Sequence, residues 1–315
     1  MTTRNPSESR VLVLGAGELG ECVLREVSAM RDAGRVASLC VLLRPAAADS
    51  AQRAALVTRL SDLRIDIVEA DLASVSEEAL ATLFQPYDQI ICCTGFVGGS
   101  GTQRKITAAV LKARVAHYIP WQFGVDYDVV GRGSGQDVWD EQLDVRDMLR
   151  AQNDVRWTIV STGMFMSFVV LPDFGLVDIE HGVVHALGDP DFALTVTTPE
   201  DIGRLTAQIA VSRPSFDDQV VHVAGDTFTY RELASTLTTE LGRPFSVECW
   251  EVPQLKADAT AHPEDTMRKY RLSFARKDGV AWPKDETFNA KAGIPVTGLA
   301  AWLSEWHAHG FDKVR

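Results

Sequence analysis

The sequence predicts an α/β fold, in which a doubly wound parallel sheet is followed by a smaller C-terminal lobe. Three observations support this prediction. Apolar stretches of strand length alternate with stretches of helical periodicity along the first half of the chain. A glycine-rich turn joins the first of these strands to the first helix. Beyond residue 162 the alternation gives way to short strand-like pieces interrupted by proline and glycine, which indicates a change of architecture.

The turn after the first strand has the pattern G-x-G-x-x-G, with Gly15, Gly17 and Gly20 at the three positions. The first glycine permits the turn, the second lets a pyrophosphate approach the backbone, and the third lets the helix lie close to the strand. Glu18 and Leu19 lie between the last two glycines, at the helix start whose free N–H groups bind phosphate. An ordinary strand-to-helix turn is the alternative. The order strand, turn, helix favours the dinucleotide-binding site of a Rossmann-like fold.

The ends of the next three strands complete the predicted cofactor site. The second strand ends at Arg44. An arginine there suits the 2′-phosphate of NADP(H), whereas NAD-binding proteins usually carry an acidic residue; a solvated surface arginine is the alternative. Asp71 follows the third strand, where an adenine edge would lie, and Thr94-Gly95-Phe96 follows the fourth. Because ligands of such sheets bind outside the carboxyl ends of the strands, these residues are expected to be neighbours in space.

The other elements of the first half follow from periodicity and from helix-start signals. The predicted strands are 11–14, 36–43, 65–70, 89–93, 116–120 and 156–161. The predicted helices are 21–30, 46–60, 74–84, 103–114 and 137–152.

We assign residues 1–162 to the dinucleotide-binding domain and residues 163–315 to the substrate lobe. A strand at 219–224 is a candidate to return to the first domain. Other elements expected in the second half are a strand at 182–187, a helix that starts at Thr198 and Pro199, and a helix at 229–241.

The glycine-bearing loop 125–136 has two interpretations. It could be a second phosphate-binding turn, but no helix-entering lysine follows it. A mobile substrate lid is favoured, because long loops beside a cofactor edge usually gate access.

The helix at 137–152 is strongly charged. Its apolar positions place Gln142 on the inner side, whereas Asp140, Asp144 and Asp147 are expected to be largely solvated.

Aromatic and methionine side chains gather at the same predicted edge of the sheet. Met164, Phe165 and Phe168 follow the sixth strand, and Trp121 follows the fifth. Such stripes serve as core or as pocket. We assign these four residues to substrate binding.

Composition excludes several classes of function. A formal net charge of -12 argues against nucleic acid or an anionic membrane as a partner. No signal peptide, membrane span or metal-ligand spacing is expected, so a cytoplasmic, metal-free protein is predicted. The five cysteines lie mostly in apolar runs and are expected to be reduced and buried.

With the glycine turn and Arg44, three further motifs carry a family resemblance: residues 103–109 (QRKITAA), 118–124 (YIPWQFG) and 144–149 (DVRDML). Laid out in this order, they resemble the isoflavone reductase-like and NmrA-like families of atypical short-chain dehydrogenases, and most of all their fungal branch. The resemblance implies an NADP(H)-binding domain, to which Gln103 and Phe123 would contribute. It also implies a substrate lobe and reduction of aromatic or alkaloid-like secondary metabolites.

The sequence departs from that family at two places. Gln142 stands where isoflavone reductase-type enzymes usually carry a lysine that binds the nicotinamide ribose and serves as acid and base. Their Pro-Ser-Glu-Phe-Gly turn becomes Pro120-Trp-Gln-Phe-Gly124. A glutamine can hold a ribose hydroxyl but cannot exchange a proton near neutral pH. Asp140, Glu141 or Tyr127 are therefore the candidates to supply a proton or to stabilise a cation.

Three functions are consistent with these residues. The first is an NADP(H)-dependent reductase of a conjugated carbonyl or imine, in which an aromatic wall of Phe96, Trp121, Phe123 and Phe165 binds the substrate. The second is an NADP-bound cyclase or isomerase of an imine that makes no net use of hydride. The third is a non-catalytic NADP sensor. A monomer or a homodimer is expected.

Overall fold

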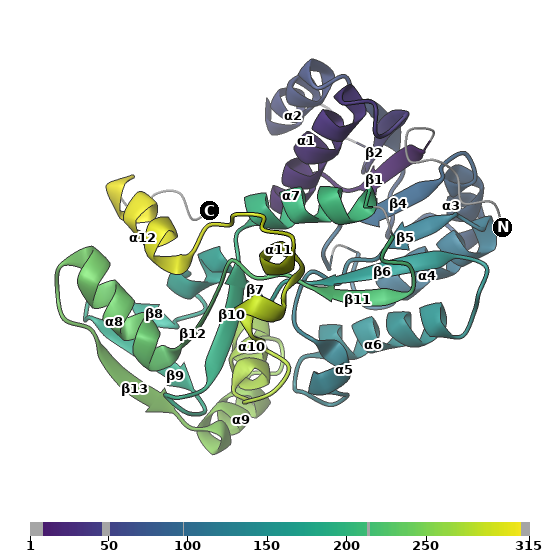
Figure 1. Cartoon of the computed structure of the whole chain (residues 1–315). Helices are drawn as coiled ribbons and strands as arrows, with labels where there is room; N and C mark the ends of the chain where they lie inside the picture. The colour runs from purple at the N-terminus through teal and green to yellow at the C-terminus, as the bar shows by residue number, and fades with distance from the viewer. Residues whose placement is uncertain (1–8, 46–50, 97, 213–214, 310–315) are drawn as a thin grey trace. The chain divides into compact units, whose positions relative to one another are not determined.

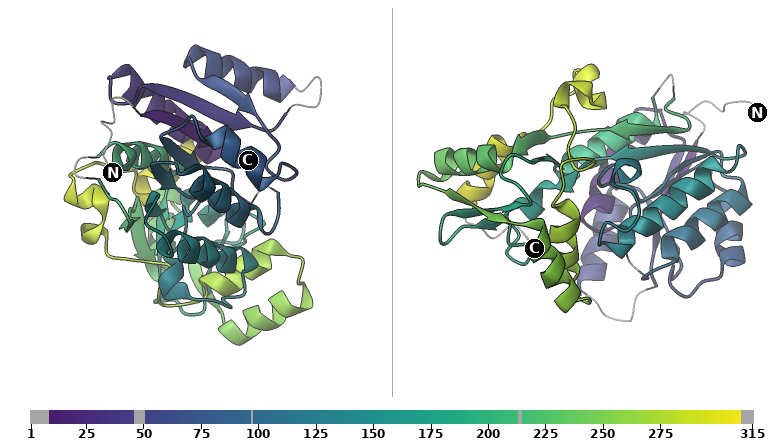
Figure 2. Two further views of the ribbon diagram at one scale, coloured as in Figure 1. Left: turned by 90° about the vertical axis from the view of Figure 1, so that its right-hand side faces the viewer. Right: turned by 90° about the horizontal axis from the view of Figure 1, so that it is seen from below.

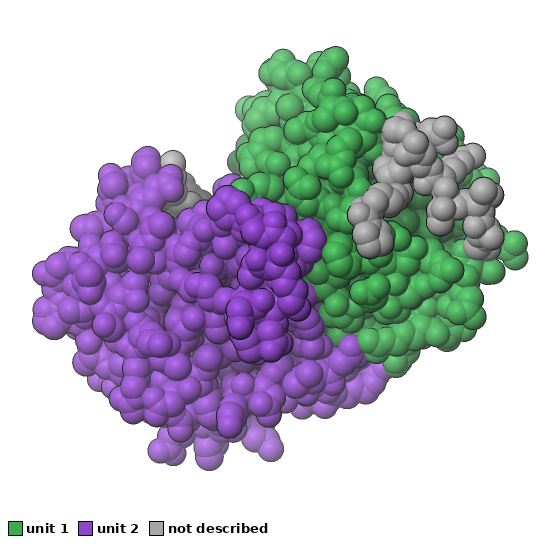
Figure 3. Space-filling model, viewed as in Figure 1, with its two compact units in different colours: residues 1–122, 144–160, 202–221 green, residues 123–143, 161–201, 222–315 purple. Residues whose placement is uncertain are grey.

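The structure is a computed structural model that describes residues 9–45, 51–96, 98–212 and 215–309. The chain forms two compact units, coloured separately in Figure 3: residues 1–122, 144–160 and 202–221 make unit 1, and residues 123–143, 161–201 and 222–315 make unit 2. These boundaries differ from the predicted division at residue 162, because the chain passes between the units several times. Unit 2 is also about as large as unit 1 rather than smaller.

Unit 1 is built around a seven-stranded sheet. Its strands are β1 (Arg10–Leu14), β2 (Ser38–Leu43), β3 (Asp66–Glu69), β4 (Gln89–Cys92), β5 (His117–Ile119), β6 (Arg156–Ser161) and β11 (Gln219–His222), in the order β11-β6-β5-β4-β1-β2-β3. β1 pairs in parallel with both β2 and β4, and parallel pairing continues to β3 on one side and through β5 to β6 on the other. The doubly wound parallel sheet is therefore confirmed, and the strand at 219–224 does return to it (Figure 1).

Helices cover both faces of this sheet, because alternate strand residues point to opposite sides. The helices are α1 (Glu18–Asp32), α2 (Ala51–Asp62), α3 (Glu77–Phe84), α4 (Thr102–Ala113), α6 (Asp137–Arg150) and α7 (Pro199–Ala210). Leu12, Leu14 and Ile90 face a core completed by α3, α4 and α6, which the left view of Figure 2 shows from outside. On the other face α7 lies against α1, where a Cβ at Gly203 would come within 2.7 Å of the Cys22 backbone.

Most predicted boundaries in unit 1 lie within a few residues of the observed ones, and β6 matches the prediction at both ends. The helix α1 begins at Glu18, one turn before the predicted start, because Gly17 already serves as its N-cap. The predicted helix at 46–60 is observed from Ala51, and residues 46–50 lie outside the described residues.

Unit 2 contains two three-stranded sheets, of order β12-β10-β7 and β13-β9-β8. Its elements are β7 (Met164–Phe165), β8 (Val177–Asp178), β9 (Val183–Leu187), β10 (Ala193–Thr197), β12 (Asp226–Thr229), β13 (Ser246–Trp250), α5 (Tyr127–Val130), α8 (Tyr230–Leu241), α9 (Val252–Ala261), α10 (Thr266–Phe274), α11 (Phe288–Lys291), α12 (Leu299–Ala308) and the 3₁₀ helices η2 (Met166–Val170) and η3 (Lys284–Glu286). The capping box of Thr229 and Glu232 starts α8 one residue after the predicted position.

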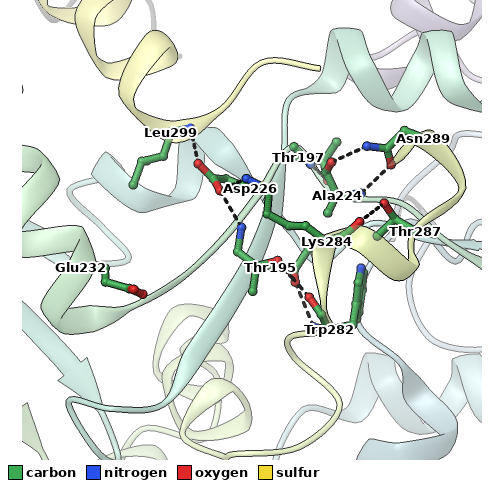
Figure 4. Close-up of polar contacts among 12 residues, drawn as sticks. Thr195, Thr197, Ala224, Asp226, Glu232, Trp282, Lys284, Thr287, Asn289 and Leu299 are labelled. Carbon is green, nitrogen blue, oxygen red and sulfur yellow. Dashed lines mark hydrogen bonds and ion pairs between the residues drawn. The ribbon is translucent and has the colours of Figure 1, made fainter. Parts of the chain in front are cut away.

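Polar side chains fix the C-terminal segment of unit 2 to β10 and β12 (Figure 4). Asp226 accepts hydrogen bonds from Lys284 Nζ at 2.7 Å and from Leu299 N at 2.9 Å. The buried amide of Asn289 exchanges two hydrogen bonds with the backbone of Ala224, at 3.1 and 3.0 Å. These contacts join segments that lie more than fifty residues apart in the chain.

The loop 125–136 is not a single mobile lid in this structure. Val125, Tyr127 and Val130 are buried, and residues 127–130 form α5. Residues 131–135 form an exposed to partly exposed turn, in which the carboxylate of Asp140 accepts a hydrogen bond from Gly133 N at 3.0 Å and Ser273 Oγ donates to Ser134 O at 3.1 Å.

Four of the five cysteines are buried and free, as predicted, but Cys249 is exposed on β13, which corrects that part of the prediction. None of the helices in the described residues is long and apolar enough to cross a membrane.

Candidate dinucleotide-binding site

The glycine turn of unit 1 has the geometry that its pattern predicts. Gly15 has a φ of 90°, which favours glycine, and it packs so closely on the end of β4 that a Cβ would lie 3.2 Å from Thr94 Cα. A Cβ at Gly20 would lie 2.3 Å from the Gly15 carbonyl oxygen. Gly15 and Gly20 are therefore required by the packing of the chain itself, at the turn and at the strand–helix contact.

Gly17 is different, because nothing in the described part of the chain requires a glycine there. Its φ of -79° is open to any residue, and a Cβ would meet no atom of the described residues within 4 Å. Gly17 is the N-cap of α1 and no side chain caps that helix end. The space above Gly17 and the first-turn N–H groups of Glu18 and Leu19 together fit a bound pyrophosphate, which needs a close backbone approach and N–H donors.

The turn after β4 is held by Gln103 of α4. The Gln103 Nε2 donates to Gly95 O at 2.7 Å and to Thr94 Oγ1 at 3.1 Å, and the side chain is almost completely buried. We expected Gln103 to contact the cofactor; instead its amide positions the Thr94–Gly95 turn. Phe96, at the end of the turn, is one of the few large apolar side chains among the described residues that are exposed.

Arg44 and Asp71 follow the neighbouring strands β2 and β3. Asp71 accepts hydrogen bonds from Ala73 N and Ser74 Oγ, both at 3.0 Å. The bond from Ala73 N, and then the one from Ser74, hold the pKa of Asp71 below its usual value, with a smaller contribution from the Arg44 charge. Arg44 is exposed. This electrostatic contribution is consistent with the predicted adjacency of the two residues.

A buried pair that was not among the predicted site residues lies behind the turn after β5. Arg146 of α6 and Gln122 are both fully buried, and Arg146 Nε donates to Gln122 Oε1 at 2.9 Å. Gln122 replaces the family's glutamate in the motif 120–124, and this departure was the signal that could have identified the pair.

The candidates to supply a proton, Asp140, Glu141 and Tyr127, belong to unit 2, as does Gln142. Gln142 is buried, as predicted, and Tyr127 is buried too. Glu141 is also buried, whereas most charged side chains of a surface helix are solvated. Asp140 is partly exposed and holds the Gly133 backbone, so it acts on the loop. Phe123, which precedes Tyr127 by four positions in the sequence, is buried as well.

A histidine–aspartate pair in unit 2 was not predicted. His222 Nε2 lies 3.1 Å from Asp126 Oδ2, and the His222 ring meets Trp282 edge-on at 4.7 Å. The carboxylate and the indole fix the orientation of the imidazole, which remains partly exposed. No residue pattern marks this pair, because ninety-six positions separate its members.

The predicted substrate residues have different environments. Met164 is buried in β7, where it pairs with Val196 of β10, so it belongs to the core. Phe165 and Phe168 of unit 2 and Trp121 of unit 1 are partly exposed. In the part of the chain that the structure describes, no group of three or more potential ligands could hold a metal ion.

The fold and the glycine turn define a Rossmann-like dinucleotide-binding architecture. The sequence pattern of the NmrA-like family matches residues 7–294, and the chain belongs to this family. An NmrA-like family domain-containing oxidoreductase of Gibberella moniliformis is 44% identical over 299 residues, which cover 94% of this chain and 97% of that protein. An isoflavone reductase homologue of Arabidopsis thaliana is 25% identical over 78% of this chain and 79% of its own length.

Solved structures share this fold. An isoflavone reductase superposes with a TM-score of 0.77 at 20% identity, over 95% of this chain and 99% of that one. The complex of leucoanthocyanidin reductase of Vitis vinifera with NADPH gives a TM-score of 0.77 at 19% identity, with the same coverage. An NADPH-dependent quinone oxidoreductase of Escherichia coli, in complex with NADPH, gives 0.73 at 20% identity and covers 94% of this chain and 99% of that one.

Proposed function

We propose that this chain is an NADP(H)-dependent oxidoreductase that reduces a conjugated carbonyl or imine of an aromatic small molecule. The observation that carries the proposal is the open space at Gly17. A glycine that the chain does not need for its own packing, at an uncapped helix start, is what a bound pyrophosphate requires. The oxidoreductase name of the 44% identical fungal relative supports the same class.

The residues of unit 1 would bind and orient the cofactor, whose chemistry when bound is hydride transfer. The N–H groups at the start of α1 would hold the pyrophosphate. Arg44 would bind the 2′-phosphate as an exposed guanidinium at the end of β2. The Thr94–Gly95 turn, fixed by Gln103, would present backbone groups at the next strand end.

Reduction of a carbonyl also consumes one proton, which has to reach the substrate oxygen. Gln142 cannot supply it near neutral pH. We propose that His222 does, because an imidazole exchanges protons in this range and Asp126 fixes its orientation through Nε2. Asp140 is less suitable, because its carboxylate binds the Gly133 backbone.

Titration calorimetry with NADPH and NADH tests the cofactor assignment, with Gly17→Ala as the informative variant. Tight NADPH binding by the wild type is expected. The added methyl group is expected to weaken it by about tenfold or more, since overpacking costs about 1–3 kcal/mol. Stability should fall by less than about 1 kcal/mol, because the methyl group meets no atom of the chain. Absence of NADPH uptake by the wild type would overturn the proposal.

Anaerobic NADPH absorbance separates the reductase from the NADP sensor. The probes are 9,10-phenanthrenequinone, a planar conjugated carbonyl, and 2-methyl-3,4-dihydroisoquinolinium, a preformed iminium. Consumption of one NADPH per product formed supports the reductase. Binding of NADPH without consumption of either probe contradicts the reductase and favours the NADP sensor, for which the buried Gln142 in place of a lysine is the motivating observation.

A further inference from the structure

Six aromatic side chains of unit 2 form one connected group, which we call the aromatic cluster. Its members are Tyr127, Trp139, Phe168, Phe174, Tyr270 and Phe274. The ring centroids of neighbouring members lie 5.2 to 6.4 Å apart, and most pairs meet edge to face. Such pairs add stability beyond the area that they bury. The members come from α5, α6, η2, the turn after η2 that carries Phe174, and the distant α10, so their meeting is a product of the fold.

The cluster has a buried end and an accessible end. Phe174 is completely buried, and Trp139, Tyr127 and Phe274 are nearly so. Tyr270 of α10 and Phe168 of η2 are partly exposed, with ring centroids 6.4 Å apart. The accessible end therefore presents two aromatic rings, backed by four that cannot move aside without loss of packing.

The accessible end also carries a hydrogen-bond donor that the protein itself does not use. Throughout residues 9–45, 51–96, 98–212 and 215–309, Tyr270 Oη has no hydrogen-bond partner. Burial raises the pKa of Tyr270 above its ordinary value, so its hydroxyl stays protonated and able to donate throughout the physiological range. Because Tyr270 is partly exposed, a ligand can reach this hydroxyl from outside and accept a hydrogen bond from it.

We propose that the accessible end of the aromatic cluster binds a planar aromatic ketone, whose carbonyl oxygen accepts a hydrogen bond from Tyr270. The rings of Tyr270 and Phe168 would contact the aromatic plane. A hydroxyl donor favours a neutral acceptor oxygen over an iminium, which has no lone pair to accept a hydrogen bond. This inference rests on the proposed function for the statement that the bound ketone is the molecule to be reduced.

Binding of two matched probes tests the inference without NADPH and without turnover. 9-Fluorenone and fluorene share one planar skeleton, and only fluorenone has a carbonyl. Quenching of tryptophan fluorescence gives both dissociation constants. The wild type is expected to bind fluorenone more tightly than fluorene by about 2- to 10-fold, the range of one neutral hydrogen bond. Tyr270→Phe should abolish that difference and leave fluorene binding unchanged.

Tyr230→Phe is the matched control, because it removes a buried hydroxyl elsewhere in unit 2. It should retain the preference for fluorenone. Equal binding of the two probes by the wild type, or an unchanged preference in Tyr270→Phe, would overturn the inference. Because neither probe measurement involves the nucleotide, failure here is distinguishable from failure of NADPH binding. Loss of fluorene binding in Phe168→Ala would support contact between the bound probe and the Phe168 ring. Unchanged fluorene binding in this variant would contradict that contact.

Discussion

Arg146 Nε donates a hydrogen bond to Gln122 Oε1 at 2.9 Å, and both side chains are fully buried. This contact ties α6 to the turn that follows β5, so it fixes one edge of the candidate cofactor site from behind. The stability of the fold depends on the acceptors of this guanidinium. If a buried charge loses a hydrogen bond, its desolvation still costs free energy and the bond no longer offsets that cost.

Gln122→Met keeps the size of the side chain and removes the acceptor. We expect the free energy of unfolding to fall by about 1.5–3 kcal/mol, the value of a hydrogen bond to a charged group. Urea denaturation measures it, and Gln52→Met at an exposed position of α2 is the control. Equal midpoints for the two variants would contradict a structural role for the pair.

Gly20→Ala tests the strand–helix contact. The new methyl group would collide with the Gly15 carbonyl at 2.3 Å, which is backbone and cannot rotate away. We expect a loss of about 3 kcal/mol, at the upper end of overpacking. Gly17→Ala serves as the comparison, because its methyl group meets nothing. If thermal melting ranks the two variants in the opposite order, the assignment of packing to Gly20 and of ligand approach to Gly17 is wrong.

Arg44→Ala tests the preference for NADP(H) over NAD(H). Removal of a charged hydrogen bond to the 2′-phosphate should weaken NADPH binding by about tenfold or more and leave NADH binding unchanged. Calorimetry measures both. Arg59→Ala, which removes an exposed arginine that is paired with Glu21 on the same unit, should change neither affinity. Equal losses for NADPH and NADH would exclude a specific role in binding the 2′-phosphate.

The depressed pKa of Asp71 predicts a pH dependence of stability. Because its pKa is lower in the folded than in the unfolded chain, the ionised carboxylate stabilises the fold above about pH 4, the unfolded value. The contribution is lost as the pH falls through the folded pKa. The difference in melting temperature between wild type and Asp71→Asn should therefore be present at pH 7 and shrink at pH 3. Ser74→Ala removes one donor and should reduce the difference; a difference that grows on acidification refutes the sign.

His222→Gln tests the proposed proton donor. We expect kcat for phenanthrenequinone reduction to fall by about 100-fold or more, the usual contribution of a general acid, with unchanged NADPH affinity. His262→Gln, at an exposed position after α9, is the control. Unchanged kcat across pH 6 to 9 would assign the proton to another group.

The sequence predicts well what is decided locally. The glycine turn, the strand ends and the starts of the helices predicted at 74–84 and 229–241 depend on residues a few positions apart, and the structure has them at or near the expected places. Apolar periodicity likewise predicts the buried side of α6, including Gln142.

What the sequence does not predict depends on distant partners. The burial of Arg146 and Glu141 contradicts the ordinary expectation for charges on a helix, and the pairing of Arg146 with Gln122 appears only when α6 lies behind β5. The same holds for His222 with Asp126 and for the contact of Tyr270 with Phe168. Gln103 differs from these pairs, because the sequence does identify it, as a cofactor-binding residue. In the structure its amide supports the Thr94–Gly95 turn rather than facing outward.

The position of β11 has a consequence for how the chain is made. β6 is complete at Ser161, but its outer neighbour in the sheet, β11, comes only with Gln219–His222. During synthesis on the ribosome, therefore, some sixty residues emerge while the edge of β6 has no partner strand, and exposed edges recruit other chains. A recombinant fragment cut after residue 162 would keep that edge permanently, so we expect it to precipitate where the full chain remains in solution.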